Sequence, residues 1–367
     1  MMPAHSALGA DRVVHFACAG CYVAPMRGSR FRIACLGAGL VAVAALTAGA
    51  ATANETAATP RVVFVLQRGG GCPARGTLEL CEGIREAMRL TGVTGRIVAP
   101  TFRESNAEFL GLLARQRPEL VVTFGQYFER AFSRVVAHHP AVPFALMDAS
   151  RTVLKRPPRN VQGIVFRTSE AAYLAGWLAG KLERRRPGGD VVGVVGGVKV
   201  PPVRDFVVGF AAGARRAAPG IEVLVDYSDD FLDRSKCSAL ARRQIARGAG
   251  TVFNVAGECG LGTLAAAASA GIWGVGVDSD QSFLGPHILT SVLKRFDAGF
   301  LELLRQVKAG RVVTGRDTIL GMRDGAVGLA EISKKVPRSL VQQVDELRRK
   351  IVAGIVVVPS VPARNTG

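Results

Sequence analysis

Short apolar runs alternate with segments of helical periodicity along most of the chain. The runs are almost continuously apolar, as expected of parallel strands buried on both faces. Between them, apolar residues recur at helical spacing, as at Val203, Val207 and Phe210, and Ser105 with Glu108 forms a capping box that opens another helix. The predicted strands are Val62–Gln67, Gly95–Ala99, Leu120–Phe124, Phe144–Asp148, Val161–Phe166, Val191–Val195, Glu222–Asp226, Thr251–Val255, Trp273–Asp278 and Ile288–Leu293.

This alternation predicts an α/β fold with parallel sheets and right-handed crossovers. The strands are too many for one ordinary doubly wound sheet, so we expect two lobes joined by several chain crossings. The segment Arg151–Asn160, RTVLKRPPRN, contains two prolines and four cations and is interpreted as one crossing. The expected lobes are 60–158 with 290–312, and 159–289 with 313–360. Ligands of such sheets bind at the carboxyl ends of strands, which here means the cleft between the lobes.

The first 53 residues have the pattern of an export signal. Arg27, Arg30 and Arg32 precede the apolar run IACLGAGLVAVAALTAGA, and Ala51-Thr52-Ala53 supplies small residues for cleavage. We expect residues 1–53 to be a signal peptide with an N-terminal extension, Met26 being the natural start. A membrane anchor is the alternative, because the apolar run is about 19 residues long. Cys35 lies at the front of this run, so we expect export without lipidation.

Charge and composition bear on whether the protein binds nucleic acid and whether it forms oligomers. The 367-residue chain carries a net charge of +18, but its basic residues are scattered and no stacking aromatics are interleaved with them. We therefore expect no nucleic-acid partner. Apolar residues make up 49% of the chain, enough for a packed core without oligomerisation, and we expect a monomer.

Four cysteines remain after the predicted cleavage, and an even number in an oxidising compartment suggests disulfides. Cys72 and Cys81 are nine residues apart across a turn-rich segment. Cys237 lies near the start of a helix and Cys259 just past a strand, on the same rim of a parallel sheet. A metal site is not expected, because these cysteines form no C-x-x-C pair and have no neighbouring histidine.

Signatures of catalysis are absent from the sequence: it has no G-x-S-x-G, no H-E-x-x-H and no Walker A motif. We expect no catalytic residue and no cofactor. His138 and His139 are interpreted as a solvated helix end. Gly257-x-x-Gly260-x-Gly262 follows a strand and opens a helix, so it is either an anion or hydroxyl site or a tight βα turn.

The stretch GVGVDSDQSFLGPHILTSVLKRFDAG, residues 274–299, holds the candidate site residues. Asp278 ends an apolar strand, and Asp280 follows two residues later. A carboxylate there can accept hydrogen bonds from two hydroxyl groups, as in a sugar diol. Lys294 follows the next strand and could meet a carboxylate or a ligand. Alternatively the acids cap the next turn and Lys294 is solvated. A hydrolase with the two acids as acid and base is disfavoured, because both lie on one short turn.

Several motifs together resemble the basic membrane protein family, the purine-nucleoside-receptor-like solute-binding components of ABC importers. They are VVGVVGGVKVPPVRDFVVGFAAGARRAAPGIEVLVDY, AGECGLG, GVGVDSDQ, LTSVLKR and GMRDGAVGLA, and the resemblance runs from about residue 62 to residue 331. It implies a type I periplasmic binding protein fold, with two Rossmann-like lobes and a three-crossing hinge. It also implies ligand contacts from Asp278 and Lys294, and an aromatic contact from Phe253.

One segment departs from the family pattern. Relatives carry Asp-Lys-x-Phe-Asn after the first strand, whereas this chain has Pro73, Gly76 and Thr77 at the corresponding positions. The base-stacking half of a purine site is therefore missing, and Gln126 and Tyr127 are the substitutes we expect. The resemblance implies an exported protein that passes a nucleoside- or sugar-like ligand to an ABC permease. The alternative is a ligand sensor of the same fold that signals to a membrane partner.

Overall fold

The computed structural model describes residues 61–67, 72, 78–101, 103–154 and 156–361. The side chains of residues 78 and 125–131 are outside this description. The predicted signal peptide and Pro73, Gly76 and Thr77 also fall outside it. Among the described residues, no helix combines the length and the apolar character needed to cross a membrane.

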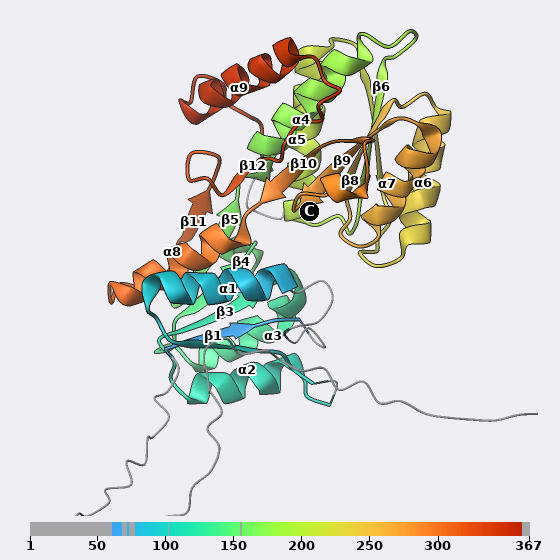
Figure 1. The fold of residues 1–367 in the computed structure, drawn as a ribbon. Coiled ribbons are helices and arrows are strands. Elements are labelled where there is room, and N and C mark those ends of the chain that lie inside the picture. The colour runs from blue at the N-terminus through green and yellow to red at the C-terminus, as the bar shows by residue number, and fades with distance from the viewer. Residues whose placement is uncertain (1–60, 68–71, 73–77, 102, 155, 362–367) are drawn as a thin grey trace, which may run out of the picture. The chain divides into compact units, whose positions relative to one another are not determined.

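The first lobe is a six-stranded parallel sheet in the order β11-β5-β4-β3-β1-β2 (Figure 1). Helices α1 and α8 pack together over one face, with Phe64, Ile84 and Phe300 in the shared core. Helices α2 and α3 cover the other face. The elements are β1 (Val62–Val65), α1 (Leu78–Thr91), β2 (Gly95–Val98), α2 (Asn106–Arg115), β3 (Leu120–Phe124), α3 (Gly125–His138), β4 (Phe144–Met147), β5 (Val161–Phe166), α8 (Phe296–Lys308) and β11 (Asp317–Leu320).

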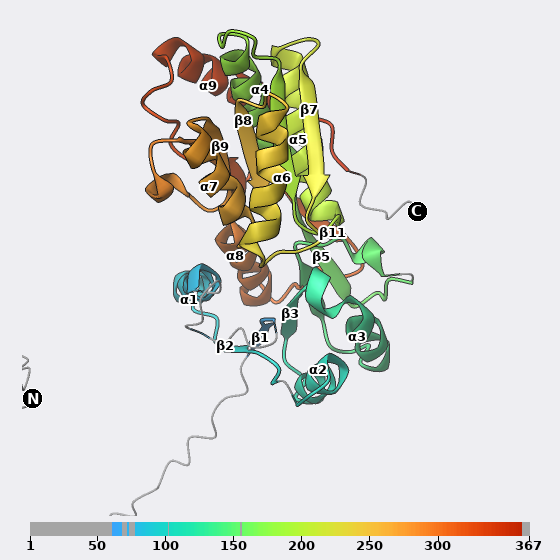
Figure 2. The same ribbon diagram turned by 90° about the vertical axis from the view of Figure 1, so that its right-hand side faces the viewer.

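The second lobe is a six-stranded sheet in the order β12-β10-β9-β8-β6-β7, parallel except for β12. Helices α4, α5 and α9 lie over one face, and α6 and α7 pack side by side on the other (Figure 2). The elements are α4 (Thr168–Glu183), β6 (Val191–Gly196), α5 (Pro201–Ala217), β7 (Glu222–Tyr227), α6 (Arg234–Ala246), β8 (Thr251–Val255), α7 (Gly260–Ala270), β9 (Trp273–Asp278), β10 (Ile288–Lys294), β12 (Val327–Leu329) and α9 (Arg338–Val352).

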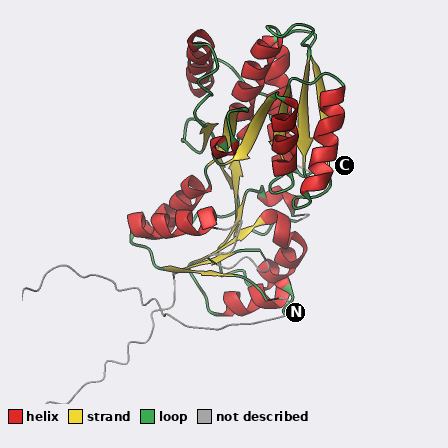
Figure 3. Ribbon diagram, turned by 45° about the vertical axis from the view of Figure 1, so that its right-hand side comes forward, coloured by secondary structure: helices red, strands yellow, loops and turns green. Residues whose placement is uncertain are grey.

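Both sheets are therefore doubly wound, with helices on each face (Figure 3). Continuously apolar strands require this arrangement, because both of their faces must be removed from water. The predicted capping box is present at the start of α2, where Ser105 and Glu108 satisfy each other's backbone N–H groups. Such a cap stabilises a helix by about 1 kcal/mol.

The chain passes between the two sheets three times, after β5, after β10 and after β11, which is the expected three-crossing connection. The expected lobe boundaries, however, differ from the observed ones. Segment Arg151–Asn160 is no crossing: a short 3-10 helix, Arg151–Val153, returns the chain to the same sheet, where Val161 pairs with Phe144. Residues 290–294 belong to the second sheet rather than the first.

The physical reason is that the first two crossings are very short. Arg167 directly follows β5 and its backbone N–H donates to the carbonyl of Leu320, at the end of β11; Arg295 directly follows β10 and its backbone N–H donates to the carbonyl of Ala326, just before β12. A connection this short has no run of glycine, proline and polar residues that would mark it as a loop in the sequence. The proline-rich segment is instead a surface loop within one lobe.

Glycines bring α4 and α5 into close contact in the second lobe. A Cβ atom on Gly213 would collide with the carbonyl oxygen of Tyr173, and one on Gly176 with that of Phe210. The two helix backbones therefore touch directly. This contact builds the layer that supports β6, β8 and β10 beneath the cleft.

Candidate functional site: the interlobe cleft

A cleft of about 1060 Å³ is lined by residues from both lobes, and we call it the interlobe cleft. Its walls come from the carboxyl ends of strands in both sheets and from the helices that follow them, as expected for open α/β sheets. The first lobe contributes Leu66, Gln67, Glu79, Leu80, Glu82, Gly83, Glu86, Phe124 and Asp148, together with Phe296 and Asp297; the second contributes Pro202, Val203, Phe206, Phe231, Leu232, Val255, Gly257, Glu258, Val277, Asp278, Ser279, Asp280, Leu293 and Lys294, and Arg295 lies at the crossing.

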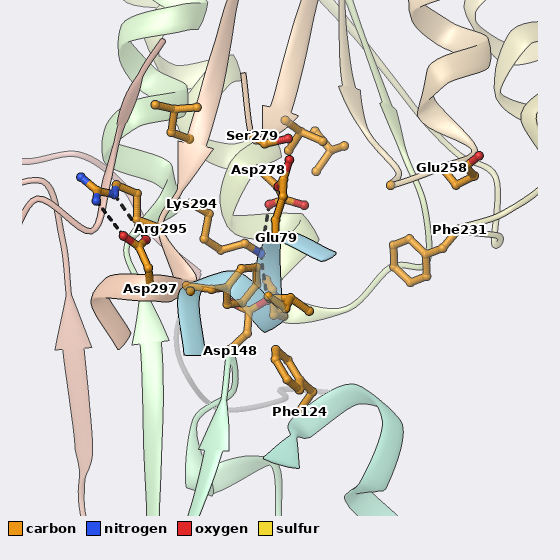
Figure 4. Close-up of a pocket in the computed structure, with 18 of the residues that line it drawn as sticks. Glu79, Phe124, Asp148, Phe231, Glu258, Asp278, Ser279, Lys294, Arg295 and Asp297 are labelled. Atoms are coloured by element: carbon orange, nitrogen blue, oxygen red, sulfur yellow. Dashed lines mark hydrogen bonds and ion pairs between the residues drawn. The ribbon is translucent and has the colours of Figure 1, made fainter. Parts of the chain in front are cut away.

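Lys294 lies at the centre of this cleft (Figure 4). Its side chain is only 6% exposed, and its Nζ atom donates a hydrogen bond to Asp148 Oδ2 at 2.8 Å. The same Nζ atom is 3.3 Å from Asp278 Oδ1. Asp148 follows β4 of the first lobe, and Asp278 ends β9 of the second. One ammonium group therefore joins the strand ends of the two lobes.

Both acids have a left-handed backbone conformation, with φ of 59° at Asp148 and 63° at Asp278. This conformation costs most L-residues about 1–2 kcal/mol, and aspartate is among the residues that tolerate it best. At both positions it turns the chain sharply at the end of a parallel strand. Local strain of this kind is concentrated at functional sites, where the surrounding structure holds it in place.

Burial and charge act in opposite directions on this cluster. Burial raises the pKa of the Asp148 carboxyl, and the positive charge of Lys294 only partly offsets this effect. Burial alone would lower the pKa of the Lys294 ammonium, but the two carboxylates outweigh it and hold that pKa above its ordinary value. The Lys294 ammonium also lies 5.2 Å from the ring centre of Phe206 and 5.0 Å from that of Phe296, within the range of cation–π attraction.

Asp278 retains hydrogen-bonding capacity toward the cleft. Its Oδ1 atom is buried and close to Lys294, but it has no well-aligned hydrogen bond to any described residue. We treat this contact as an ion pair, since 3.3 Å is long for a charge-assisted hydrogen bond. The side chain is nevertheless 43% exposed, so the carboxylate remains open to a solute.

Four phenylalanines line the cleft: Phe124, Phe206, Phe231 and Phe296. The first ends β3, and the others lie in segments that follow β6, β7 and β10. Sequence reasoning missed all four as site residues. The signal that could have found them is their position at or shortly after the carboxyl end of a predicted strand.

The expected aromatic contact at Phe253 is wrong. Its side chain is fully buried and packs against Phe206 and Phe210, with ring centres 6.1 and 5.0 Å apart. Phe253 is two residues from the end of β8, where the sheet is covered by helices on both faces, and the cleft is reached only by Val255.

Comparison with known proteins identifies the family. The profile described as "Bmp: ABC transporter substrate-binding protein PnrA-like" matches residues 77–361. The chain belongs to the Bmp family. It is 32% identical to basic membrane protein B of Borrelia garinii subsp. bavariensis over 246 residues, which cover 66% of this chain and 69% of that protein. It is 30% identical to the CD4+ T-cell-stimulating antigen of Listeria monocytogenes over 270 residues, 69% of this chain and 73% of the relative.

Among solved structures, an ABC transporter solute-binding protein from Aeropyrum pernix K1 superposes with a TM-score of 0.68 at 23% identity, covering 82% of this chain and 94% of that one. This likeness confirms the type I periplasmic binding protein fold. The Bmp family consists of binding proteins rather than enzymes, so the protein is a solute-binding component of an ABC transporter.

Of the other residues expected at the site of this Bmp protein, only some can be placed relative to the cleft. Asp280 lines the cleft, and its Oδ1 atom also accepts a hydrogen bond from Ser282 N at 2.9 Å, so it caps the following turn as well. Gln126 and Tyr127 lie in the first turn of α3, but their side chains are outside the description. Thr77 is outside it entirely.

The glycine-rich turn of this Bmp protein is explained mainly by packing. Gly257 lines the cleft and has a positive φ of 56°. A Cβ atom on Gly260 would collide with the Asn254 side chain, and one on Gly262 would collide with the Arg234 carbonyl. These two positions therefore favour the tight-turn interpretation.

Two disulfides lie behind cleft-lining segments, and they join the pairs expected from the sequence. Cys72–Cys81 has a Cα–Cα distance of 6.1 Å and holds the first turns of α1, next to Leu80 and Glu82. Cys237–Cys259 has a Cα–Cα distance of 5.5 Å, and the backbone N–H of Cys259 donates to the carbonyl of Phe231 at 2.9 Å. Each lobe thus has one cross-link beside its part of the cleft.

Proposed function

We propose that this protein is exported, without lipidation, and binds a small hydroxylated ligand, nucleoside-like or sugar-like, in the interlobe cleft for delivery to an ABC permease. The observation that carries the proposal is the Asp148–Lys294–Asp278 cluster, which joins both lobes inside the cleft. It supports a ligand site because an open carboxylate is held in a fixed position by a buried ammonium group.

In this proposal the side chains bind and orient the ligand, and no bond is made or broken. Asp278 accepts hydrogen bonds from ligand hydroxyl groups, and the nearby Lys294 ammonium holds its carboxylate in place. Phe231 and Phe296, which are partly exposed, offer flat apolar surface to a ring of the ligand. A ligand that contacts both lobes binds the closed arrangement more tightly and shifts the hinge equilibrium toward it.

A thermal-shift screen with nucleosides, bases and sugars tests the proposal. A ligand present at 100 times its Kd stabilises the folded protein by about 2.7 kcal/mol, so a hit raises the melting temperature clearly. We expect Asp278→Ala to abolish the shift for hydroxylated hits. The matched control is Asp345→Ala, which removes an exposed carboxylate on α9 that is paired with Arg348.

If the hits shift Asp278→Ala as much as the wild type, the assignment of the site is wrong. Delivery to a permease is tested separately by uptake of the labelled hit in cells with and without the gene for this protein. Equal uptake in both would contradict the transport role and leave only ligand binding.

A further inference from the structure

The segment that follows α9, residues 353–361, connects that helix to a buried carboxylate near the interlobe cleft, and we call it the strap. Its last five residues belong to no helix or strand. Val356 and Val358 pack against the hydrophobic core, whereas Ile355 and Val357 are 73% and 87% exposed. This alternation is that of an extended chain with one face on the protein. Residues 353–361 themselves do not line the cleft.

The far end of the strap is attached to Asp205 of α5. The backbone N–H of Val361 donates to Asp205 Oδ1 at 3.0 Å. The other oxygen, Oδ2, accepts from the backbone N–H of Ser169 at 2.8 Å and from the Thr168 hydroxyl at 3.1 Å. Asp205 is only 7% exposed, so an oxygen that loses a donor is poorly compensated by water. One buried carboxylate therefore joins the strap to the start of α4.

The near end of the strap is attached to the third crossing. The Arg323 guanidinium, in the turn after β11, donates to the carbonyl of Val352 from Nε at 3.1 Å and from Nη2 at 2.6 Å. In the same turn, the backbone N–H of Met322 donates to Glu170 Oε2 at 2.7 Å, and Glu170 lies in the first turn of α4. The strap, the third crossing and the start of α4 thus form a closed ring of contacts.

This ring reaches the cleft through the first turns of α5. Pro202, Val203 and Phe206 of these turns line the cleft. The ring centre of Phe206 is 5.2 Å from the Lys294 ammonium. Asp205 and Phe206 are consecutive residues of one helix, so a displacement of the Asp205 backbone also displaces this part of the cleft wall.

From these contacts we infer that Asp205 and the strap are positioning elements of the ligand site, which hold the starts of α4 and α5 in the arrangement that binds ligand. This inference rests on the proposed function, because it takes the interlobe cleft as the ligand site. The attached strap raises the affinity for ligand without touching it. Coupling between two sites is reciprocal, so bound ligand also strengthens the attachment of the strap.

The test uses Val361→Pro, which removes the N–H group that donates to Asp205 and changes no charge. The matched control is Val357→Pro, in the same segment, at an exposed residue whose backbone N–H donates to no described residue. Calorimetry measures the affinity of both variants for adenosine and for glucose. We expect Val361→Pro to weaken the probe that binds about three- to tenfold, and the control to stay within about twofold of the wild type.

Hydrogen exchange of the full chain shows whether the effect travels from the strap. Without any probe, Val361→Pro should speed exchange of the amides in the first turns of α4 and α5, whereas a local role would change exchange in the strap alone. In the wild type, the probe that binds should slow exchange in the strap, because the coupling is reciprocal.

A second variant, Asp205→Asn, breaks the same contact from the other side. Its amide has one acceptor oxygen instead of two, and that oxygen serves two donors when it faces Thr168 and Ser169 but only one when it faces Val361. We expect Asp205→Asn combined with Val361→Pro to bind the probe no more weakly than either single variant. Losses that multiply would show that the two positions act separately, and would overturn the inference.

An affinity of Val361→Pro within about twofold of the wild type overturns the inference and leaves the proposed function intact. If the wild type binds neither adenosine nor glucose, exchange in the probe-free protein decides. Unchanged exchange in the first turns of α4 and α5 then overturns the inference, and faster exchange there supports it. The proposed function itself is judged by the wider thermal-shift screen, which does not involve these variants.

Discussion

The side chain of Lys294 contacts residues of both lobes. It ends a strand of the second lobe, pairs with Asp148 of the first and also reaches Asp278, while its stem lies among Phe206 and Phe296. Removing one partner from a buried ion pair leaves a buried charge without compensation, and this penalty exceeds the stabilisation that the intact pair provides.

We therefore predict that Lys294→Met lowers the free energy of unfolding by about 3–5 kcal/mol, because Asp148 is left buried without its cation. Chemical denaturation measures the change. The double variant Lys294→Met with Asp148→Asn should recover a large part of the loss, since it no longer buries an unpaired charge. A double variant as unstable as Lys294→Met would contradict this explanation.

Asp230 holds the turn that presents Phe231 and Leu232 to the cleft. Its carboxylate accepts a hydrogen bond from Lys236 Nζ at 2.8 Å, and from the backbone N–H groups of Leu232 and Asp233 at 2.8 and 3.1 Å. The Lys236 ammonium, and then these N–H groups, hold the pKa of the carboxyl well below its ordinary value of 3.8.

A lowered pKa in the folded state stabilises the protein above the unfolded pKa, and this contribution is lost as the pH falls toward the folded value. We predict that Asp230→Asn lowers the melting temperature by a constant amount between about pH 5 and 7. Below the ordinary pKa of 3.8 the difference from the wild type should shrink. A difference that grows on acidification would refute this role of Asp230.

At the scale of elements, the α4–α5 contact depends on glycines rather than on large apolar side chains. The backbones of the two helices touch at Gly176, Gly209 and Gly213, and no Cβ atom can be added there without displacing one helix. Both helices support the sheet whose strand ends form the second-lobe wall of the cleft.

We predict that Gly213→Ala destabilises the protein by about 1–3 kcal/mol, as overpacking of a tight contact does. The matched control is Gly111→Ala in α2, where no atom lies within 4 Å of the added Cβ. This control should be neutral or stabilise by up to about 1 kcal/mol, because alanine favours helix more than glycine does. Equal effects of the two substitutions in denaturant titrations would argue against the close contact.

The disulfide Cys237–Cys259 joins α6 to the turn after β8, across 22 residues of sequence. We predict that the double variant Cys237→Ser with Cys259→Ser loses about 2–4 kcal/mol of stability, mainly because its unfolded chain is less constrained. It should also bind ligand more weakly, because the bridge fixes the turn in which the backbone N–H of Cys259 donates to the carbonyl of Phe231. Unchanged affinity in a folded double variant would limit this bridge to a role in stability.

At the scale of the whole molecule, three very short crossings connect two lobes that each have their own sheet and core helices. We predict that saturating ligand lowers the radius of gyration measured by small-angle X-ray scattering, because a ligand that touches both lobes favours closure. Asp278→Ala should remove this change at the same ligand concentration. Compaction that persists in the variant would show that closure does not depend on this carboxylate.

The fold class and most strands follow from the hydrophobic pattern of the sequence, because parallel strands buried on both faces must be continuous apolar runs. Leu120–Phe124, Val161–Phe166, Thr251–Val255 and Trp273–Asp278 were predicted with their observed bounds. The two short edge strands β11 and β12 were not predicted, because β11 is mostly half-exposed and β12 has three residues, too few for a periodic signal. Family resemblance pointed to Asp278 and Lys294. Asp148 also ends a predicted strand, as Asp278 does, but only the tertiary structure pairs it with Lys294, 146 residues away.

Where the chain crosses between lobes and which aromatic rings line the cleft follow only from the tertiary structure, as does the excess of acids over cations among the described lining residues. Composition records how many charged residues a chain has, whereas the pairing of strands decides which of them meet at one sheet edge. Phe253 illustrates the same limit: it lies two residues before the end of β8 in a sheet covered on both faces and is buried, whereas Phe124, Phe206, Phe231 and Phe296 line the cleft.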